Sequence, residues 1–510
     1  MTRSKRFLQG AAATYSYQAV VILTGFWLTP FYLGRIGQSD YGLWLVGTQL
    51  LMYLSITDFG IVALLPQETA YATGRAGGVE QAHDLAEIVG RAIRVVLYQV
   101  PLVAIVAGVL WLALPSAWGT LRGPLAIILV GYVAVFPLRI LTAVLQGLQD
   151  LSFAAMVQAL NWAFSTGATV IMVSLGWNLY ALAIGWVLSQ LVFAPVLLYR
   201  LRTRYPSVLP NRLPPLTWTA VKVQFAKGGW VTVAQIAQLL LSNTDLLIIG
   251  KLLGPAAVVP YACTGKLASI LANQAQILMQ TATPGLCELK ASEQPKRLFQ
   301  ALVGLSQILL TFSGLVFCLV LVVNQWFVGW WVNAAQYGGS ALTVAILINI
   351  VFVHWNTVAA YGVFCLGHQK RIALTNLGNG IATAGGCLVF AHFWGPVGAP
   401  LGSLVGTCLV GLPFNLRRIA RDTGVSVFGL VGETLGSWFV RFAPLAALCT
   451  IVAQQWSPKN LFEAAGVSFA IAGLYLAVMI PFLLRSSVGS HIRVLWSSLL
   501  HRFAFTGAAL

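Results

Sequence analysis

Two ionisable residues lie inside long apolar stretches of the sequence. Asp245 is in the stretch 229–250 and Lys266 in the stretch 258–281, and a short turn joins the two. In the hydrocarbon core of a bilayer an ionisable side chain costs at least about 2.5–3.5 kcal/mol, so each residue needs a partner or a function. Either the two form an ion pair that holds neighbouring helices together, or they line a cavity and bind a charged ligand.

Polar residues continue from both charges at helical spacing. On the first stretch they are three, four and three residues apart, which puts them on one helix face; they are Gln235, Gln238, Ser242 and Asp245. On the second stretch the spacing is seven, with Gln276 close to the same face; these residues are Lys266, Asn273 and Gln280. Two such faces on adjacent helices either wall a water-filled cavity or hydrogen-bond across a packed bundle. The first interpretation makes them substrate-binding residues.

Two further charges lie near the ends of apolar stretches. Asp58 occurs late in 41–65, in the run TDFG, and counting residues from the opposite end places it near the inner membrane surface. A helix-end or gate contact is expected there. Arg139 lies late in 124–144 at a similar depth, where it either meets an anionic headgroup or extends to the interface.

Signatures of catalysis and of metal binding are missing from the sequence. It contains no GxxxxGK[ST], HExxH or GxSxG motif, and no DxD pair of the kind that holds a metal for glycosyl transfer. The seven cysteines show no metal-ligand spacing, and most lie in apolar stretches, so we interpret them as small core residues. We therefore expect neither an enzyme nor a bound cofactor or metal.

The composition predicts the elements that position these residues. Of 510 residues, 58% are hydrophobic and 8% are charged, against about 25% charged residues in soluble domains. Stretches long enough to cross the ~30 Å hydrocarbon core predict an all-α polytopic membrane protein with about fourteen transmembrane helices. They fall near 10–33, 41–65, 93–114, 124–144, 153–175, 179–199, 229–250, 258–281, 299–323, 341–364, 372–393, 397–416, 435–453 and 464–484.

The net charge of +17 is explained by membrane topology. Its basic residues sit in short connections between apolar stretches, which argues against a nucleic-acid partner. Nearly all of them fall on one side of the predicted topology, and the other side holds only Arg35, Arg122, Lys251 and Lys459. Because cytoplasmic loops are enriched in lysine and arginine, both termini are expected in the cytoplasm.

A proline-rich basic connection, 200–227, divides the chain near its middle. The two halves also share a short repeat. FLQG at 7–10, before the first expected helix, matches FAKG at 225–228, and the turn GRIG at 34–37 matches GKLLG at 250–254. Both copies begin in the cytoplasm, so the repeat is parallel, as in transporters with a site between two lobes. We expect an N-terminal lobe in 1–212, a C-terminal lobe in 213–421, and two extra helices with a cytoplasmic tail in 422–510.

The stretch YGLWLVGTQLLMYLSITDFGIVALLPQETA (41–70) resembles the polysaccharide-transporter branch of the multidrug/oligosaccharidyl-lipid/polysaccharide (MOP) flippase superfamily. The stretch SNTDLLIIGKLLGPAAVVPYACTGKL (242–267) resembles that branch's repeat of the same region. The resemblance implies two six-helix lobes around a central cavity, followed by two extra helices. It also implies a bacterial inner-membrane protein that flips undecaprenyl-diphosphate-linked oligosaccharides, such as O-antigen units, to the outer leaflet by alternating access.

Cationic cavity residues of the family make Lys266 the first candidate for the diphosphate headgroup, with Asp245 as its counter-ion. The family also implies H⁺ or Na⁺ as coupling ion, membrane lipids as partners, and contacts with other polysaccharide-assembly proteins. Related lipid II flippases carry several arginines in the N-terminal lobe. This sequence has no clear arginine inside the corresponding stretches except Arg139, near the cytoplasmic end of one of them.

Two alternatives stay open. A cation-coupled multidrug exporter has the same topology but needs an acidic site, and Asp245 is the one deep carboxylate expected. A membrane-embedded glycan polymerase or ligase would be expected to carry a large outer loop with basic or histidine residues, whereas the outer loops here are short and nearly uncharged.

Overall fold

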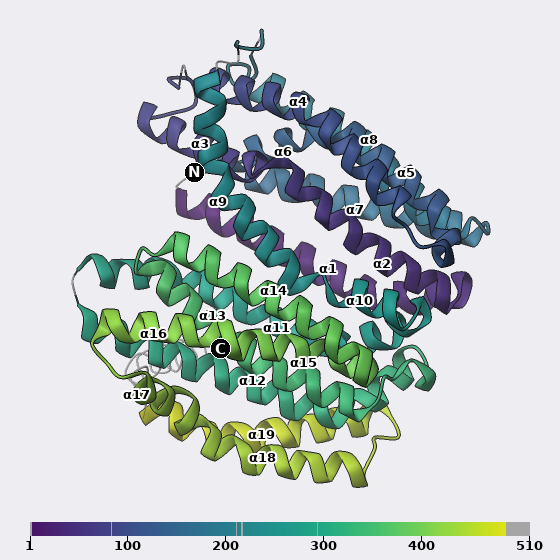
Figure 1. The fold of residues 1–510 in the computed structure, drawn as a ribbon, viewed down its shortest axis with the longest axis vertical. Coiled ribbons are helices and arrows are strands. Elements are labelled where there is room, and N and C mark those ends of the chain that lie inside the picture. The colour runs from purple at the N-terminus through teal and green to yellow at the C-terminus, as the bar shows by residue number, and fades with distance from the viewer. Residues whose placement is uncertain (1–2, 83, 211, 216–217, 293, 486–510) are drawn as a thin grey trace, which may run out of the picture. The chain divides into compact units, whose positions relative to one another are not determined.

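The computed structural model describes residues 3–82, 84–210, 212–215, 218–292 and 294–485, and within them every regular element is helical (Figure 1). The expected cytoplasmic tail beyond residue 485 lies outside the described residues. By its internal contacts the chain divides into two units, Met1–Val259 and Pro260–Leu510. The expected lobe boundary near residue 212 concerns the repeat and stays a prediction.

The described part holds eleven helices long and apolar enough to cross a membrane, or up to thirteen if each of two bent pairs is one span. The class of all-α polytopic membrane protein is therefore confirmed, while the count of fourteen is not. One of the eleven, Gln369–Thr423, is 55 residues long and turns back on itself at Gly395–Val397, where two spans were expected.

The first unit packs its helices around one apolar core. The core joins α3, α4, α6 and the end of α8 through residues such as Leu65, Val89, Phe136 and Val144, all fully buried. The helices are α1 (Arg3–Ile36), α2 (Gln38–Leu54), α3 (Ile61–Ala76), α4 (Leu85–Leu112), α5 (Gly119–Val135), α6 (Arg139–Gly147), α7 (Leu151–Ser174), α8 (Asn178–Arg204), α9 (Trp218–Ser242) and α10 (Asp245–Leu252).

The second unit is built around α12, the most deeply buried of the long apolar helices in the described part. The last two helices pack on it: the Tyr475 hydroxyl donates to the Thr311 carbonyl at 2.8 Å, and Phe317 packs edge-on against Phe442. The helices are α11 (Pro255–Ala291), α12 (Pro295–Trp331), α13 (Ser340–Cys365), α14 (Gln369–Trp394), α15 (Gly398–Gly406), α16 (Leu412–Thr423), α17 (Val427–Val431), α18 (Ser437–Gln455) and α19 (Leu461–Arg485).

The stretch expected as one helix over 41–65 is broken. Helices α2 and α3 meet at 53°, separated by a 3₁₀ turn, Ser55–Asp58, and by Phe59 and Gly60, both in the left-handed region. The Gly60 amide donates to Asp58 Oδ1 at 2.9 Å, so the aspartate satisfies a backbone group that the helix break frees. Asp58 therefore lies at the bend between two helices, where one straight helix was expected.

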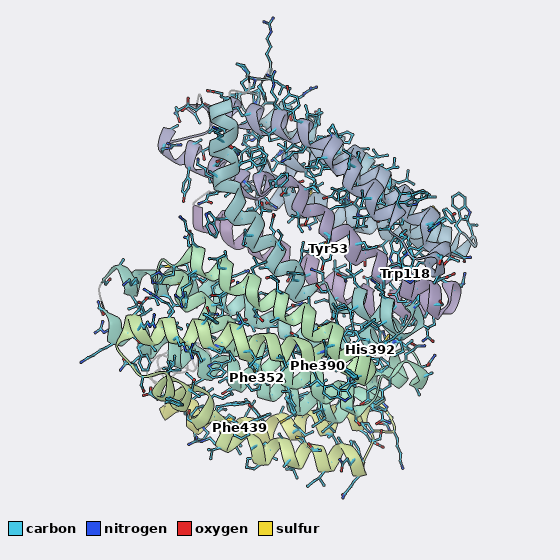
Figure 2. All side chains as sticks on the ribbon, viewed as in Figure 1. Tyr53, Trp118, Phe352, Phe390, His392 and Phe439 are labelled. Atoms are coloured by element: carbon cyan, nitrogen blue, oxygen red, sulfur yellow. The ribbon has the colours of Figure 1, made fainter. Side chains whose placement is uncertain are left out.

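The stretch expected over 229–250 is broken as well. Helices α9 and α10 meet at 50° after Ser242, where three short polar residues follow one another and compete with the helical backbone for hydrogen bonds. The α2–α3 pair packs along the α9–α10 pair in the first unit. The Tyr53 hydroxyl, labelled in Figure 2, hydrogen-bonds Thr244 at 2.8 Å, and Gly60 lies directly against the Gly228 carbonyl.

Helices α14 and α15 form a hairpin with a seam of small residues. A Cβ built on Gly402 would lie 2.1 Å from the Cys387 amide nitrogen, and one built on Gly398 would lie equally close to the Phe390 backbone. The Cys387 thiol donates to the Ala399 carbonyl at 3.0 Å. Contacts this close require glycine, because any side chain would meet backbone that cannot move aside.

Helices α6 and α13, one in each unit, end in the same local geometry, which also ends α7 at residues 175–177, so the parallel repeat stays a prediction. After each helix, three successive backbone amides donate to the carbonyls four, three and five residues earlier. The amides are those of Leu148, Gln149 and Asp150 after α6, and of Leu366, Gly367 and His368 after α13. Gln149 and Gly367 both have a positive φ, of 59° and 89°. Each helix thus ends in the same left-handed cap before the next one begins.

Candidate functional site

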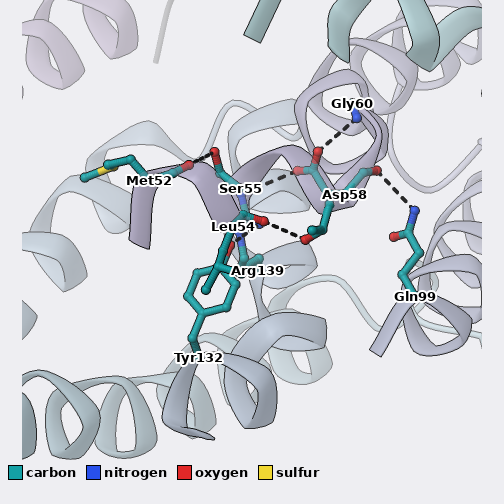
Figure 3. A network of polar contacts seen from close by, with 9 residues as sticks. Met52, Leu54, Ser55, Asp58, Gly60, Gln99, Tyr132 and Arg139 are labelled. Carbon is teal, nitrogen blue, oxygen red and sulfur yellow. Dashed lines mark hydrogen bonds and ion pairs between the residues drawn. The ribbon is translucent and has the colours of Figure 1, made fainter. Parts of the chain in front are cut away.

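A buried ion pair lies at the break between α2 and α3 (Figure 3). Asp58 is 1% exposed, and its Oδ2 lies 3.4 Å from Nη2 of Arg139, the first residue of α6. A carboxylate at this depth needs a compensating charge, since desolvating an ion costs several kcal/mol. Nothing in the sequence links the two residues, and the structure brings them together.

The two oxygens of Asp58 have different surroundings. Oδ1 accepts the Gly60 amide, whereas Oδ2 is buried and accepts no hydrogen bond from the described residues apart from its ion pair. The backbone carbonyl of Asp58 accepts Gln99 Nε2 at 3.3 Å, and the side chain of Gln235 on α9 lies beside the carboxylate. The carboxylate is thus held in place by its backbone and balanced by one guanidinium.

Arg139 is held by side chains of the first unit. Its Nη1 donates to the Tyr132 hydroxyl at 3.0 Å, and its guanidinium lies 5.6 Å from the ring centre of Phe136. The side chain is 31% exposed, and it borders a cavity inside the first unit. The helix break at the 3₁₀ turn Phe136–Leu138 points the residue inward, which a count of residues along a straight helix misses.

The cavity has a volume of about 370 Å³ and lies between α5, α6, α7 and α8. Besides Arg139 and Tyr132, its wall carries a set of uncharged polar side chains with no hydrogen-bond partner among the described residues. This polar set is Thr142, Gln146, Gln158, Asn161 and Gln190. Trp186 adds an aromatic surface. Amides within membrane-spanning helices are costly unless water reaches them, so their presence together indicates a wet cavity.

The side chains that line this cavity are of types that can bind a polar ligand. A guanidinium binds phosphate oxygens through two parallel hydrogen bonds, and amide side chains offer both donors and acceptors to hydroxyl groups. The amides of α7 and α8 were missed in the sequence. The signal was available, since Gln158, Asn161 and Gln190 interrupt the apolar stretches 153–175 and 179–199.

The expectation that one continuous helix carries Gln235, Gln238, Ser242 and Asp245 is wrong, because Asp245 lies on a different helix. Gln238 Nε2 does donate to Ser242 Oγ at 2.8 Å, and both side chains are exposed. The helix breaks after Ser242, however, so Asp245 begins α10, where its Oδ1 accepts the Leu246 amide. Gln235 instead faces the Asp58 carboxylate.

In the second unit the expected polar face of α11 is present. Lys266 is half-buried, while Asn273, Gln276 and Gln280 are exposed along the same helix. Gln276 Nε2 donates to the Tyr361 hydroxyl of α13 at 2.7 Å. Asp245 belongs to the first unit and Lys266 to the second. In the described part of the chain, no group of three or more histidine, cysteine, aspartate or glutamate residues could hold a metal ion.

The sequence matches the model of a known protein family. Residues 53–336, more than half of the chain, match the model of the family described as polysaccharide biosynthesis protein. That match includes Asp58, Arg139 and every residue of the polar set. No curated protein sequence matches the chain.

Solved structures show the same fold at low sequence identity. An inward-facing multidrug resistance MATE family transporter of the MOP superfamily is 13% identical, with a TM-score of 0.60 over 80% of this chain and 99% of that one. Lipid II flippase MurJ in an inward closed conformation is 10% identical, with a TM-score of 0.58 over 87% and 97%. The chain is thus a multi-pass membrane protein with the fold of MOP-superfamily transporters, and it belongs to the polysaccharide biosynthesis protein family.

Proposed function

We propose that the protein flips undecaprenyl-diphosphate-linked oligosaccharides, the repeat units of a surface polysaccharide, from the inner to the outer leaflet of a bacterial inner membrane. Alternating access is the mechanism, and both termini lie in the cytoplasm. One observation carries the proposal: a guanidinium and five unpartnered polar side chains line a single cavity inside the membrane-spanning helices of the first unit.

The cavity suits the headgroup of such a lipid. The diphosphate is an anion that gains two parallel hydrogen bonds from Arg139, and the sugar that follows it presents hydroxyls to the amides of Gln158, Asn161 and Gln190. Trp186 can cover an apolar face of a sugar ring. The membership in a polysaccharide biosynthesis family supports a saccharide substrate.

The other site residues keep proposed roles. Lys266 is a second cation for the headgroup, with Asp245 as its counter-ion, and Asp58 acts as a gate. Polar side chains of α9 and α11 line the path of the saccharide: Gln235, Gln238, Ser242, Asn273 and Gln280. The coupling ion is H⁺ or Na⁺, and the partners are membrane lipids and other polysaccharide-assembly proteins.

A cation-coupled multidrug exporter is the second candidate, favoured by the likeness to a MATE transporter. The charge of the cavity argues against it. A cationic drug would meet the guanidinium of Arg139, while the nearest carboxylate, Asp58, is buried and already paired. The cavity therefore favours an anionic ligand.

The proposal predicts that Arg139→Gln abolishes display of the surface polysaccharide in cells that depend on this protein, measured by labelling intact cells and by immunoblotting protein abundance. Arg91→Gln is the matched control, since Arg91 pairs with Glu87 at 3.5 Å on the surface, and its display should be unchanged. Lys266→Gln is expected to reduce display as well. Normal display by Arg139→Gln at normal abundance would overturn the proposed role of the cavity.

A further inference from the structure

We propose that Asp58 takes up one proton when an anionic headgroup binds Arg139, so that the anion and the proton enter the site together. The inference rests on the proposed function, because it requires the cavity of Arg139 to bind a phosphate-bearing ligand. It names Asp58 Oδ2 as the atom that holds the proton while the anion is bound.

The first step is that Arg139 is the only counter-charge of Asp58 within the described residues. The carboxylate is 1% exposed, and the single ion pair it makes is the one from Oδ2 to Arg139 Nη2 at 3.4 Å. Oδ1 is occupied by the Gly60 amide and does not depend on the arginine. Whatever removes the guanidinium therefore leaves Oδ2 buried and unbalanced.

The elements packed around Asp58 offer no replacement. From α5 comes the neutral phenol of Tyr132, from α4 the amide of Gln99, and from α9 the amide of Gln235. The charged groups of these elements are engaged elsewhere. On α4 Arg91 pairs with Glu87 and Arg94 donates to the Leu213 carbonyl, on α3 Arg75 donates to the Tyr71 carbonyl, and on α2 Asp40 accepts from Thr120. On α9 Lys227 pairs with Glu68, and Lys222 has an interaction of its own.

The second step is that Arg139 cannot serve a diphosphate and Asp58 equally well. An optimal charge-assisted N–H···O bond is about 2.7–2.9 Å long. At 3.4 Å, the interaction of Arg139 Nη2 with Asp58 is therefore weak. Arg139 is 31% exposed on the side of the cavity, whereas Asp58 cannot follow it because the helix break fixes its carboxylate. A phosphate that engages the guanidinium in two hydrogen bonds draws Nη2 away from Oδ2.

The third step is protonation of Asp58. An ionised carboxylate left buried without a partner costs several kcal/mol, and in such sites the group becomes neutral instead. One proton from solvent then binds Oδ2, no other bond is made or broken at Asp58, and Oδ1 keeps the Gly60 amide. When the anion leaves, Arg139 returns to Oδ2 and the proton is released. In the bound state more protons are held, so affinity for the anion rises as pH falls, by at most about tenfold per pH unit for one proton.

The test is calorimetric titration of the purified full-length protein in detergent with geranyl diphosphate, a short polyprenyl diphosphate. The titration is repeated in two buffers of different ionisation enthalpy, which yields the number of protons taken up per ligand bound. Asp58→Asn is the paired variant: its Oδ1 can still accept the Gly60 amide, and the ligand's own protons are the same for both proteins. Thermal unfolding checks that the variant is folded.

We expect wild type to take up about one proton more per ligand than Asp58→Asn, with Asp58→Asn binding at least as tightly and with a flatter pH dependence. Binding with equal proton numbers in the two proteins would overturn the inference and leave the proposed function standing. A Na⁺ requirement with no proton uptake would overturn it too. Failure of wild type to bind geranyl diphosphate at all would instead count against the proposed function.

Discussion

Arg139→Gln is expected to lower the stability of the folded protein by about 3–5 kcal/mol, because it leaves the Asp58 carboxylate buried without a counter-charge. The double variant Asp58→Asn/Arg139→Gln should recover most of that loss, since two neutral amides remove the unpaired charge. Unfolding in increasing concentrations of denaturing detergent, followed by tryptophan fluorescence, measures both effects.

The surface pair Arg91–Glu87 is the control for this cycle. Its distance of 3.5 Å nearly equals that of the buried pair, but its side chains are 39% and 56% exposed. Arg91→Gln should therefore change stability by at most about 0.5 kcal/mol. Equal effects of Arg139→Gln and Arg91→Gln would mean that Asp58 is hydrated or already neutral, contrary to the buried ion pair described above.

Gly402→Ala is the second large effect, with an expected loss of about 1–3 kcal/mol. A methyl group at this position would lie 2.1 Å from the Cys387 amide nitrogen and 2.5 Å from the Gly386 carbonyl carbon. Both atoms belong to the backbone of α14, so α14 and α15 must separate to admit it. The same unfolding assay measures the change.

Gly385→Ala is its matched control on the same hairpin. A Cβ at Gly385 meets nothing within 4 Å, and alanine favours the helix over glycine by about 0.5–1 kcal/mol. We expect Gly385→Ala to be neutral or slightly stabilising. If the two variants behave alike, the seam between α14 and α15 is looser than the contacts of Gly402 indicate.

Hydropathy predicted the class of the fold and most of the spans, because burial in lipid imposes a length and an apolar composition on each helix. The tight pair 372–393 and 397–416 appears as the reversing segment Gln369–Thr423, for example. The breaks in α2–α3 and α9–α10 were not predicted. Neither contains proline at the break, and an apolar stretch looks the same whether it is straight or bent by 50°.

The candidate site was harder to predict for a different reason. Asp58 and Arg139 were each recognised as costly charges, but three whole helices, α3, α4 and α5, lie between them in the sequence, and helical periodicity relates only residues on one helix. Their pairing depends on two helix breaks that turn both side chains inward. The polar residues of α11 do lie on one uninterrupted helix, as their spacing requires, and their role stays a prediction.

The most direct test of the central claim, that the cavity of Arg139 binds the headgroup during flipping, is transport by the purified protein. Liposomes containing wild type, Asp58→Asn/Arg139→Gln or Arg91→Gln would be loaded with an undecaprenyl-diphosphate-linked oligosaccharide, and the fraction of saccharide reached by an external lectin followed over time. The account predicts rapid exposure with wild type and Arg91→Gln, and none above protein-free liposomes with the double variant, although it is folded. Transport by the double variant at the wild-type rate would contradict the account.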